Sequence, residues 1–193
     1  MGQRLVITVK EKGKEIAKIY YHWSGYTASA YYVAKDIIDY LEYYKNKRSS
    51  TALKLIRCCE ENGGGVDSYD LDAVKKIYPK SKFKEDVNRN DGLVALTEKG
   101  MADLQRWSEG DLTIDLDDHM IYNDVFISYG GIDEYRECIG ENDDSDIYIT
   151  EVPKDIDILE CPFEDVEKAA DFVSEHVDDI LKCNDHLYLE CIR

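Results

Sequence analysis

The first 23 residues place the strongest constraint on the fold, because they have the pattern of a β-hairpin. Residues 3–9, QRLVITV, alternate in the way that is typical of a strand, and residues 16–23 form a second strand-like stretch. The E-K-G-K between them is typical of a turn. Helix-like segments follow the hairpin, so the sequence predicts an α+β protein.

The stretch YYHWSGYTASAYYVAKDII, residues 20–38, runs from the second strand directly into a helix with apolar residues at helical spacing. Small hydroxyl residues at such a junction can hold a phosphate or a nucleophile. A phosphate loop needs G-x-x-x-x-G-K-[ST] and a serine nucleophile needs G-x-S-x-G, and this stretch contains neither. We therefore interpret it as a helix start, with Thr27 or Ser24 as the N-cap.

Further elements follow along the chain. Helices are predicted from Thr51 to about Asn62, from an Asp70 cap to Tyr78, and from a Thr97 cap through Trp107. A helix is predicted from Pro162 to about Lys182, and strands over residues 93–97, 112–116, 120–127, 147–152 and 186–191. The best boundary is Ser108–Gly110. Together with a boundary after residue 48, it gives three segments: residues 1–48, residues 49–108 and residues 109–193.

Charge is distributed unevenly between the two halves of the chain. The net charge is −17, with +4 in residues 1–99 and −21 in residues 100–193. A surface acidified only for solubility would be acidic in both halves. The asymmetry therefore points to a basic partner for the acidic half.

The last predicted helix concentrates this acidity on one side, opposite its apolar stripe. Like charges four residues apart, and aspartates near a helix C-terminus, both reduce stability, so folding alone does not explain them. We predict a partner-binding face that joins this helix to the loop before it: Asp143, Asp144, Asp146, Glu164, Glu167, Asp171, Glu175 and Asp178.

The run G-L-V-A-L-T-E-K-G-M-A-D-L, residues 92–104, resembles the wing strand and following helix of winged helix-turn-helix regulators. The resemblance covers roughly residues 50–108 and implies a nucleic-acid-binding middle segment with Arg89 at the wing tip. It departs from the family in having only one clear helix between the Thr51–Asn62 helix and the wing, where the family has two. A basic patch would accompany it, interleaved with Tyr78 and Phe83: Lys75, Lys76, Lys80, Lys82, Lys84 and Arg89.

Metal sites have weaker support in the sequence. The spacing of His176, Cys183, His186 and Cys191 matches no common zinc pattern. Two aspartate clusters, at residues 115–118 and 143–146, lack the glycine and distal glutamate of a calcium loop, although a metal-dependent nuclease stays open as a third hypothesis. We expect no cofactor, no metal and no catalytic residue, and six reduced cysteines.

The start of the chain lacks the apolar core of a signal peptide, and no apolar run is long enough to span a bilayer, so we expect a cytoplasmic protein. The chain as a whole resembles phage-encoded acidic inhibitors of bacterial defence nucleases, which include the anti-CRISPR proteins. The resemblance rests on four features taken together: R-L-V-I-T-V, Y-Y-H-W-S-G-Y-T, the T-E-K-G helix and the acidic tail. That resemblance implies binding to an RNA-guided nuclease or a similar enzyme in the host cytoplasm. The alternative is the winged-helix nucleic-acid binder.

Overall fold

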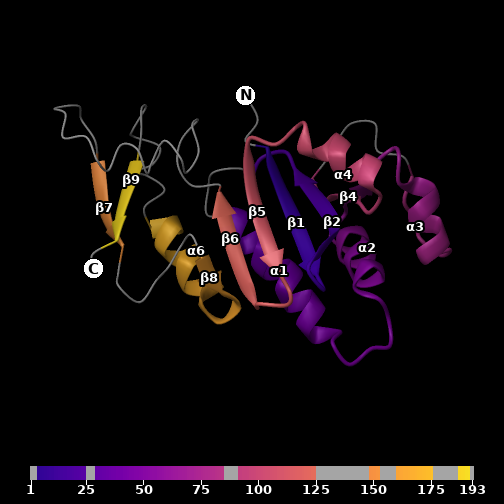
Figure 1. Cartoon of the computed structure of the whole chain (residues 1–193), viewed down its shortest axis with the longest axis horizontal. Helices are drawn as coiled ribbons and strands as arrows, with labels where there is room; N and C mark the ends of the chain where they lie inside the picture. Colours follow the sequence, from indigo (N-terminus) through magenta and orange to yellow (C-terminus); the bar gives the residue numbers. More distant parts are fainter. Residues whose placement is uncertain are drawn as a thin grey trace.

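The computed structural model describes residues 4–24, 29–84, 91–124, 148–152, 160–175 and 187–191. It confirms the predicted α+β class, since helices flank a mixed sheet of seven strands (Figure 1). The described helices are α1 (Ser29–Tyr43), α2 (Thr51–Glu61), α3 (Leu71–Ile77), α4 (Glu98–Gln105), the 3-10 turn η2 (Phe163–Asp165) and α6 (Val166–Glu175).

The large sheet has the strand order β3-β4-β2-β1-β5-β6-β8. Its strands are β1 (Leu5–Glu11), β2 (Lys14–Tyr21), β3 (Gly65–Val66), β4 (Leu93–Ala95), β5 (Gly110–Asp115), β6 (Met120–Asp124) and β8 (Glu160–Pro162). Strands β7 (Tyr148–Val152) and β9 (Leu187–Cys191) pair in parallel as a second, two-stranded sheet. The short strands β3 and β8 were not predicted from the sequence.

The N-terminal hairpin forms as predicted and lies at the centre of the large sheet. Its turn residues Lys12 and Gly13 have φ angles of +55° and +67°. Two consecutive positive φ values match the turn that the right-handed twist of paired strands favours, and glycine adopts that conformation without steric strain. Strand β2 then pairs with β4, and β1 pairs with β5.

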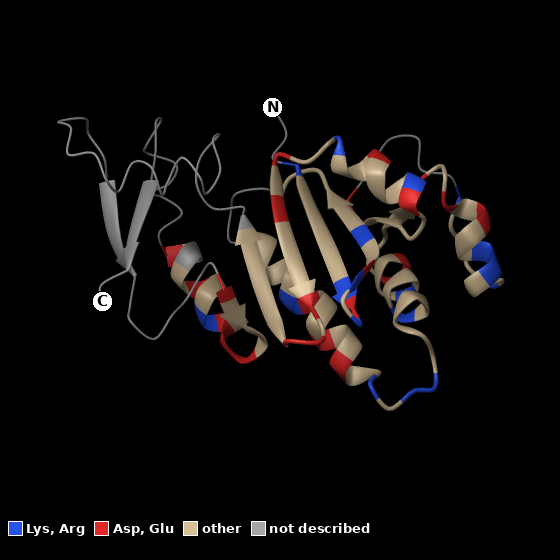
Figure 2. Cartoon of the chain, viewed as in Figure 1, with Lys and Arg blue, Asp and Glu red and all other residues tan. Residues whose placement is uncertain are grey.

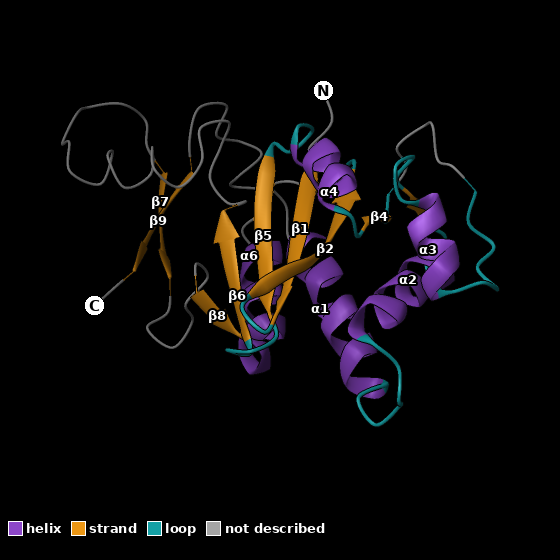
Figure 3. Cartoon of the chain, turned by 45° about the vertical axis from the view of Figure 1, so that its right-hand side comes forward, coloured by secondary structure: helices purple, strands orange, loops and turns teal. Residues whose placement is uncertain are grey.

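Helices cover the two faces of the sheet unequally (Figures 1 and 3). The main core lies on the face covered by α1, α2 and α6, where Ile7, Ile19 and Ile114 are fully buried. A smaller cluster on the opposite face packs Tyr20 and Leu93 against Leu104 of α4. Successive side chains of β1 point to opposite faces of the sheet, so Val6 belongs to the smaller cluster and Ile7 to the main core.

The large sheet takes strands from all three segments that the sequence suggested. Strand β1, from the N-terminal segment, pairs in parallel with β5, from the C-terminal segment, with the register running from Leu5↔Gly110 to Lys10↔Asp115. Strand β4, from the middle segment, pairs with β2. The boundaries after residues 48 and 108 thus fall between elements of one sheet, and the strand that resembles a wing, β4, has a neighbour on each side.

Local capping predictions have mixed outcomes. Thr97 caps α4 as predicted, because its hydroxyl accepts a hydrogen bond from the Gly100 N–H. Asp70 precedes α3, but its side chain does not cap that helix, which corrects the prediction. Pro162 ends strand β8 and precedes η2, so it does not open the α-helix directly. Ser24 is buried, and Thr27 lies outside the described residues.

Candidate acidic binding site

Helix α6 presents the predicted acidic side to solvent and buries the predicted apolar side. Val166 and Ala170 are buried in the main core, together with Ala169. The exposed side carries Glu167, Asp171 and Glu175, and Glu164 is exposed in η2 just before the helix. The other predicted members of this face lie outside the described residues: Asp143, Asp144, Asp146 and Asp178.

Helix α1 packs beside α6 and extends the acidic surface with residues that the sequence analysis did not select. A hydrogen bond of 3.2 Å from the Tyr32 hydroxyl to Asp171 Oδ1 joins the two helices. Asp39 and Glu42 are exposed on the same helix as Tyr32. Their spacing of three residues is the signal that could have found them, since such residues share one side of a helix.

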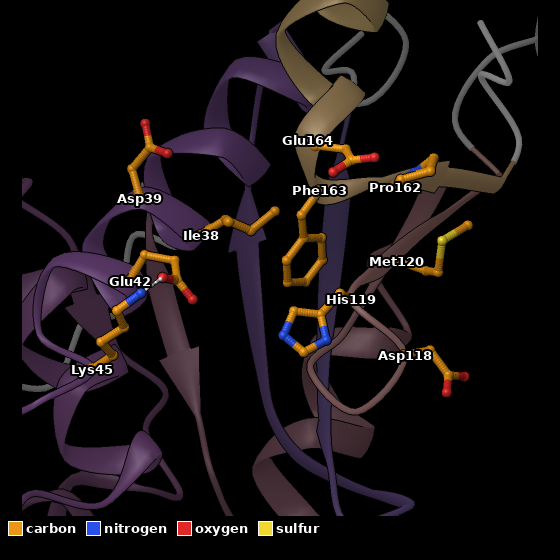
Figure 4. Close-up of a pocket in the computed structure, with 10 residues that line it drawn as sticks. All are labelled: Ile38, Asp39, Glu42, Lys45, Asp118, His119, Met120, Pro162, Phe163 and Glu164. Carbon is orange, nitrogen blue, oxygen red and sulfur yellow. Dashed lines mark hydrogen bonds and ion pairs between the residues drawn. The ribbon is translucent and has the colours of Figure 1, made fainter. Parts of the chain in front are cut away.

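A groove of about 670 Å³ lies between the second half of α1, the turn from β5 to β6, and η2 (Figure 4). Its apolar lining includes Ile38, Met120 and Phe163, and the ring of Phe163 lies 5.7 Å from the ring of His119. Carboxylates come to it from all three elements: Asp39, Glu42, Asp118 and Glu164. The groove therefore combines an apolar floor with an acidic rim.

Lysines neutralise part of the rim. Lys35 donates to Asp39 over 2.6 Å, and this hydrogen bond raises the pKa of the Lys35 ammonium. Lys45 pairs with Glu42 over 2.8 Å, as Figure 4 shows. Glu164 makes no ion pair with any residue that the structure describes, so its charge is available to a partner.

The aspartates of the β5–β6 turn have local structural partners. Asp115 accepts hydrogen bonds from the backbone N–H groups of Asp117 and Asp118. Asp117 in turn accepts from the Gly13 N–H over 2.8 Å, and hydrogen bonds from the backbone of Gly13 and Lys12 lower its pKa. These contacts tie the turn to the tip of the N-terminal hairpin.

Among the described residues, no group of three His, Cys, Asp or Glu side chains is arranged to hold a metal ion. His176, Cys183 and His186 of the zinc pattern lie outside those residues. In the portion of the chain that the structure describes, no helix is long and apolar enough to cross a membrane.

The predicted basic patch is only partly available for binding. Lys76, Lys80, Lys82 and Lys84 are exposed, whereas Lys75 is partly buried and donates to the carbonyl oxygen of Ser81. Phe83 is buried in the main core, which corrects the idea that it interleaves with the lysines as a stacking residue. Arg89 lies outside the described residues.

Acidic and basic residues are distributed unevenly along the described elements (Figure 2). The ribbon of α6 carries mostly acidic positions, and basic positions mark the end of α3 and the loop that follows α1, whereas α1, α3 and α4 each carry both signs. No protein-family model, curated protein or solved structure matches the chain. The candidate site therefore rests on its own geometry.

Proposed function

We propose that this chain is a binding protein that engages a basic surface of a nucleic-acid-handling defence enzyme, in the manner of phage-encoded inhibitors such as the anti-CRISPR proteins. The observation that carries the proposal is that acidic residues of α1, the β5–β6 turn and η2 line one groove beside the acidic side of α6. In this proposal the chain acts in the cytoplasm of the host cell, where such enzymes meet invading DNA.

Physical chemistry supports a partner with positive charge. The pairs Glu167–Asp171 and Asp171–Glu175 place like charges four residues apart on α6, where each pair costs a few tenths of a kcal/mol. Enzymes that handle DNA line their channels with lysine and arginine, because DNA carries about one charge per 1.7 Å. An acidic protein surface can compete with phosphates for such a channel, and opposite charges accelerate the encounter.

A cleavage assay tests the proposal. The purified chain is added to a panel of RNA-guided nucleases, and cleavage of a matched plasmid is measured together with direct binding. We expect one member to be inhibited at stoichiometric concentration. The triple variant Glu167→Gln, Asp171→Asn, Glu175→Gln should inhibit more weakly, whereas Glu98→Gln, which removes one charge from α4 on the other face of the sheet, should inhibit like the wild type. Absence of binding and inhibition across the panel would contradict the proposal.

Nucleic-acid binding through the segment around α3 is the second candidate function, and the exposure of Lys76, Lys80, Lys82 and Lys84 favours it. The intact chain should then retard duplex DNA at low salt, with an affinity that falls steeply as salt rises. Changing Lys80, Lys82 and Lys84 to Ala should weaken the retardation. An unchanged mobility of DNA at low salt would remove this candidate.

A further inference from the structure

We propose that the groove between α1, the β5–β6 turn and η2 receives an arginine side chain of the bound partner. The inference rests on the proposed function and names the contact at its centre. It depends on one juxtaposition: the rings of Phe163 and His119 face each other (Figure 4), in a groove that Met120, Glu42 and Glu164 also line.

Charge selects a cationic occupant. The described residues that line the groove include four acidic residues and one lysine, Lys45. Lys45 is already paired with Glu42, and Glu164 has no ion-pair partner within the described ranges. An anion would meet this rim unfavourably, whereas a cation would complete it.

The apolar floor selects a side chain with an apolar body. Ile38 is buried beneath the groove, and Met120 and Phe163 are partly exposed within it. A small hydrated ion gains nothing from such a floor. A long side chain that ends in a cation can lay its methylene groups on the floor and keep its charged end at the rim.

The rings favour arginine over lysine. A guanidinium is planar and weakly hydrated, so it can stack on an aromatic ring while its N–H groups donate to a carboxylate. Phe163 and Glu164 are adjacent in η2 and both line the groove; in Figure 4 the Phe163 ring points toward His119, and the Glu164 carboxylate lies above it, beside the ribbon. The ammonium group of lysine has no flat surface that could stack on the ring. It also lacks the paired N–H groups that a guanidinium directs at a carboxylate.

The test uses the intact chain and three small probes: N-acetyl-argininamide, N-acetyl-lysinamide and the neutral isostere N-acetyl-citrullinamide. Methyl NMR of Met120 and Ile38 reports on the groove. We expect saturable shifts with the arginine probe, binding about fivefold or more weaker with the lysine probe, and no saturation with citrulline. Equal binding of all three probes, or no shift at either methyl group, would overturn the inference.

Variants separate a groove contact from general attraction to an acidic protein. Phe163→Leu keeps the apolar floor and removes one ring, so it should reduce the preference for arginine over lysine. Glu164→Gln should weaken both cationic probes. Glu98→Gln on α4 removes one charge on the opposite face of the sheet and should leave all three titrations unchanged. An equal loss in Glu98→Gln and Glu164→Gln would show that only net charge acts, which would overturn the inference.

The outcomes also separate this inference from the proposed function. If the arginine probe fails while the α6 triple variant still loses inhibition of a nuclease, the groove proposal is wrong and the proposed function stands. If the arginine probe binds in the groove while no basic enzyme is bound or inhibited, the proposed function is wrong and the groove remains an arginine site. A third outcome concerns self-association. If the Met120 and Ile38 methyl signals shift when the free chain is diluted, and no probe shifts them, a second copy of the chain occupies the groove and the inference is overturned.

Discussion

The carboxylate of Asp70 holds Thr97 in place from 27 residues away, accepting hydrogen bonds from its N–H over 2.7 Å and from its hydroxyl over 3.0 Å. It also accepts from the Leu96 N–H over 2.8 Å, and Asp70 is fully buried. Because Thr97 caps α4, Asp70 positions the start of that helix from the start of α3.

Replacing Asp70 should therefore destabilise the protein more than losing a single helix-capping hydrogen bond, which typically costs about 1 kcal/mol. In Asp70→Ala, two part-buried backbone donors and one hydroxyl lose their acceptor, so we expect the free energy of unfolding to fall by about 2–4 kcal/mol. Asp70→Asn keeps one acceptor oxygen and should cost less. Urea unfolding measures both, and equal stability of Asp70→Ala and the wild type would contradict the role assigned to this side chain.

Gly100 on α4 is required by the same carboxylate. A Cβ atom at this position would lie 1.6 Å from Asp70 Oδ2 and 2.8 Å from Asp70 Cγ. Alanine would gain about 1 kcal/mol in helix propensity, but overpacking of this kind costs about 1–3 kcal/mol and here also disturbs the part-buried hydrogen bonds of Asp70. Gly100→Ala should thus lower the unfolding free energy.

A double-mutant cycle checks the cause of that loss. Once Asp70 is replaced by Ala, the carboxylate that a Cβ at position 100 would meet is gone. Gly100→Ala should then cost less than in the wild-type background, because only the 3.1 Å approach to Ala95 Cβ remains. Strictly additive effects of the two substitutions would place the clash elsewhere.

The buried thiols predict a decrease in stability at high pH. Burial raises the pKa of Cys58 to about 12 and that of Cys59 well above its ordinary value. In the unfolded chain a thiol titrates near about 8.5. The unfolded state therefore loses its protons first as the pH rises, and each thiol lowers the unfolding free energy by up to about 1.4 kcal/mol per pH unit until the folded thiol also ionises.

Cys58→Ala isolates one of these contributions. Between about pH 9 and about pH 11, its unfolding free energy should decline less steeply with pH than that of the wild type, by up to about 1.4 kcal/mol per unit. The packing that Cys58→Ala loses lowers the unfolding free energy by the same amount at every pH. It therefore does not affect the slope of the unfolding free energy against pH, which is compared between the variant and the wild type. Identical slopes would mean that Cys58 ionises equally easily in the folded protein.

Features encoded within a few residues were predictable from the sequence. The hairpin turn depends on a glycine between two strands, and the Thr97 cap depends on an N–H three residues away. The helical spacing along residues 30–41 predicted which side of α1 is buried, including Ala34 and Ile37. Each of these signals needs only the local period of the chain.

Long-range pairings could not be predicted in the same way. Nothing in the sequence of β1 indicates that it pairs in parallel with β5, because an apolar run of this kind identifies a buried strand but not its neighbour. The buried hydrogen bond of 2.8 Å from Asn123 to the Tyr31 hydroxyl joins residues 92 positions apart. The groove has the same origin, since Asp39, Asp118 and Glu164 meet only through the packing of the sheet and its helices.

The acidic side of α6 and α1 is the central claim, and the rate of association with an inhibited nuclease tests it most directly. In the triple variant Glu167→Gln, Asp171→Asn, Glu175→Gln, we expect the association rate at low salt to fall about tenfold or more, with a smaller difference at high salt. The unfolding free energy should stay within about 1 kcal/mol of the wild type, because these side chains are exposed and their mutual repulsion is relieved. A variant that keeps both its stability and the wild-type association rate at low salt would contradict the claim.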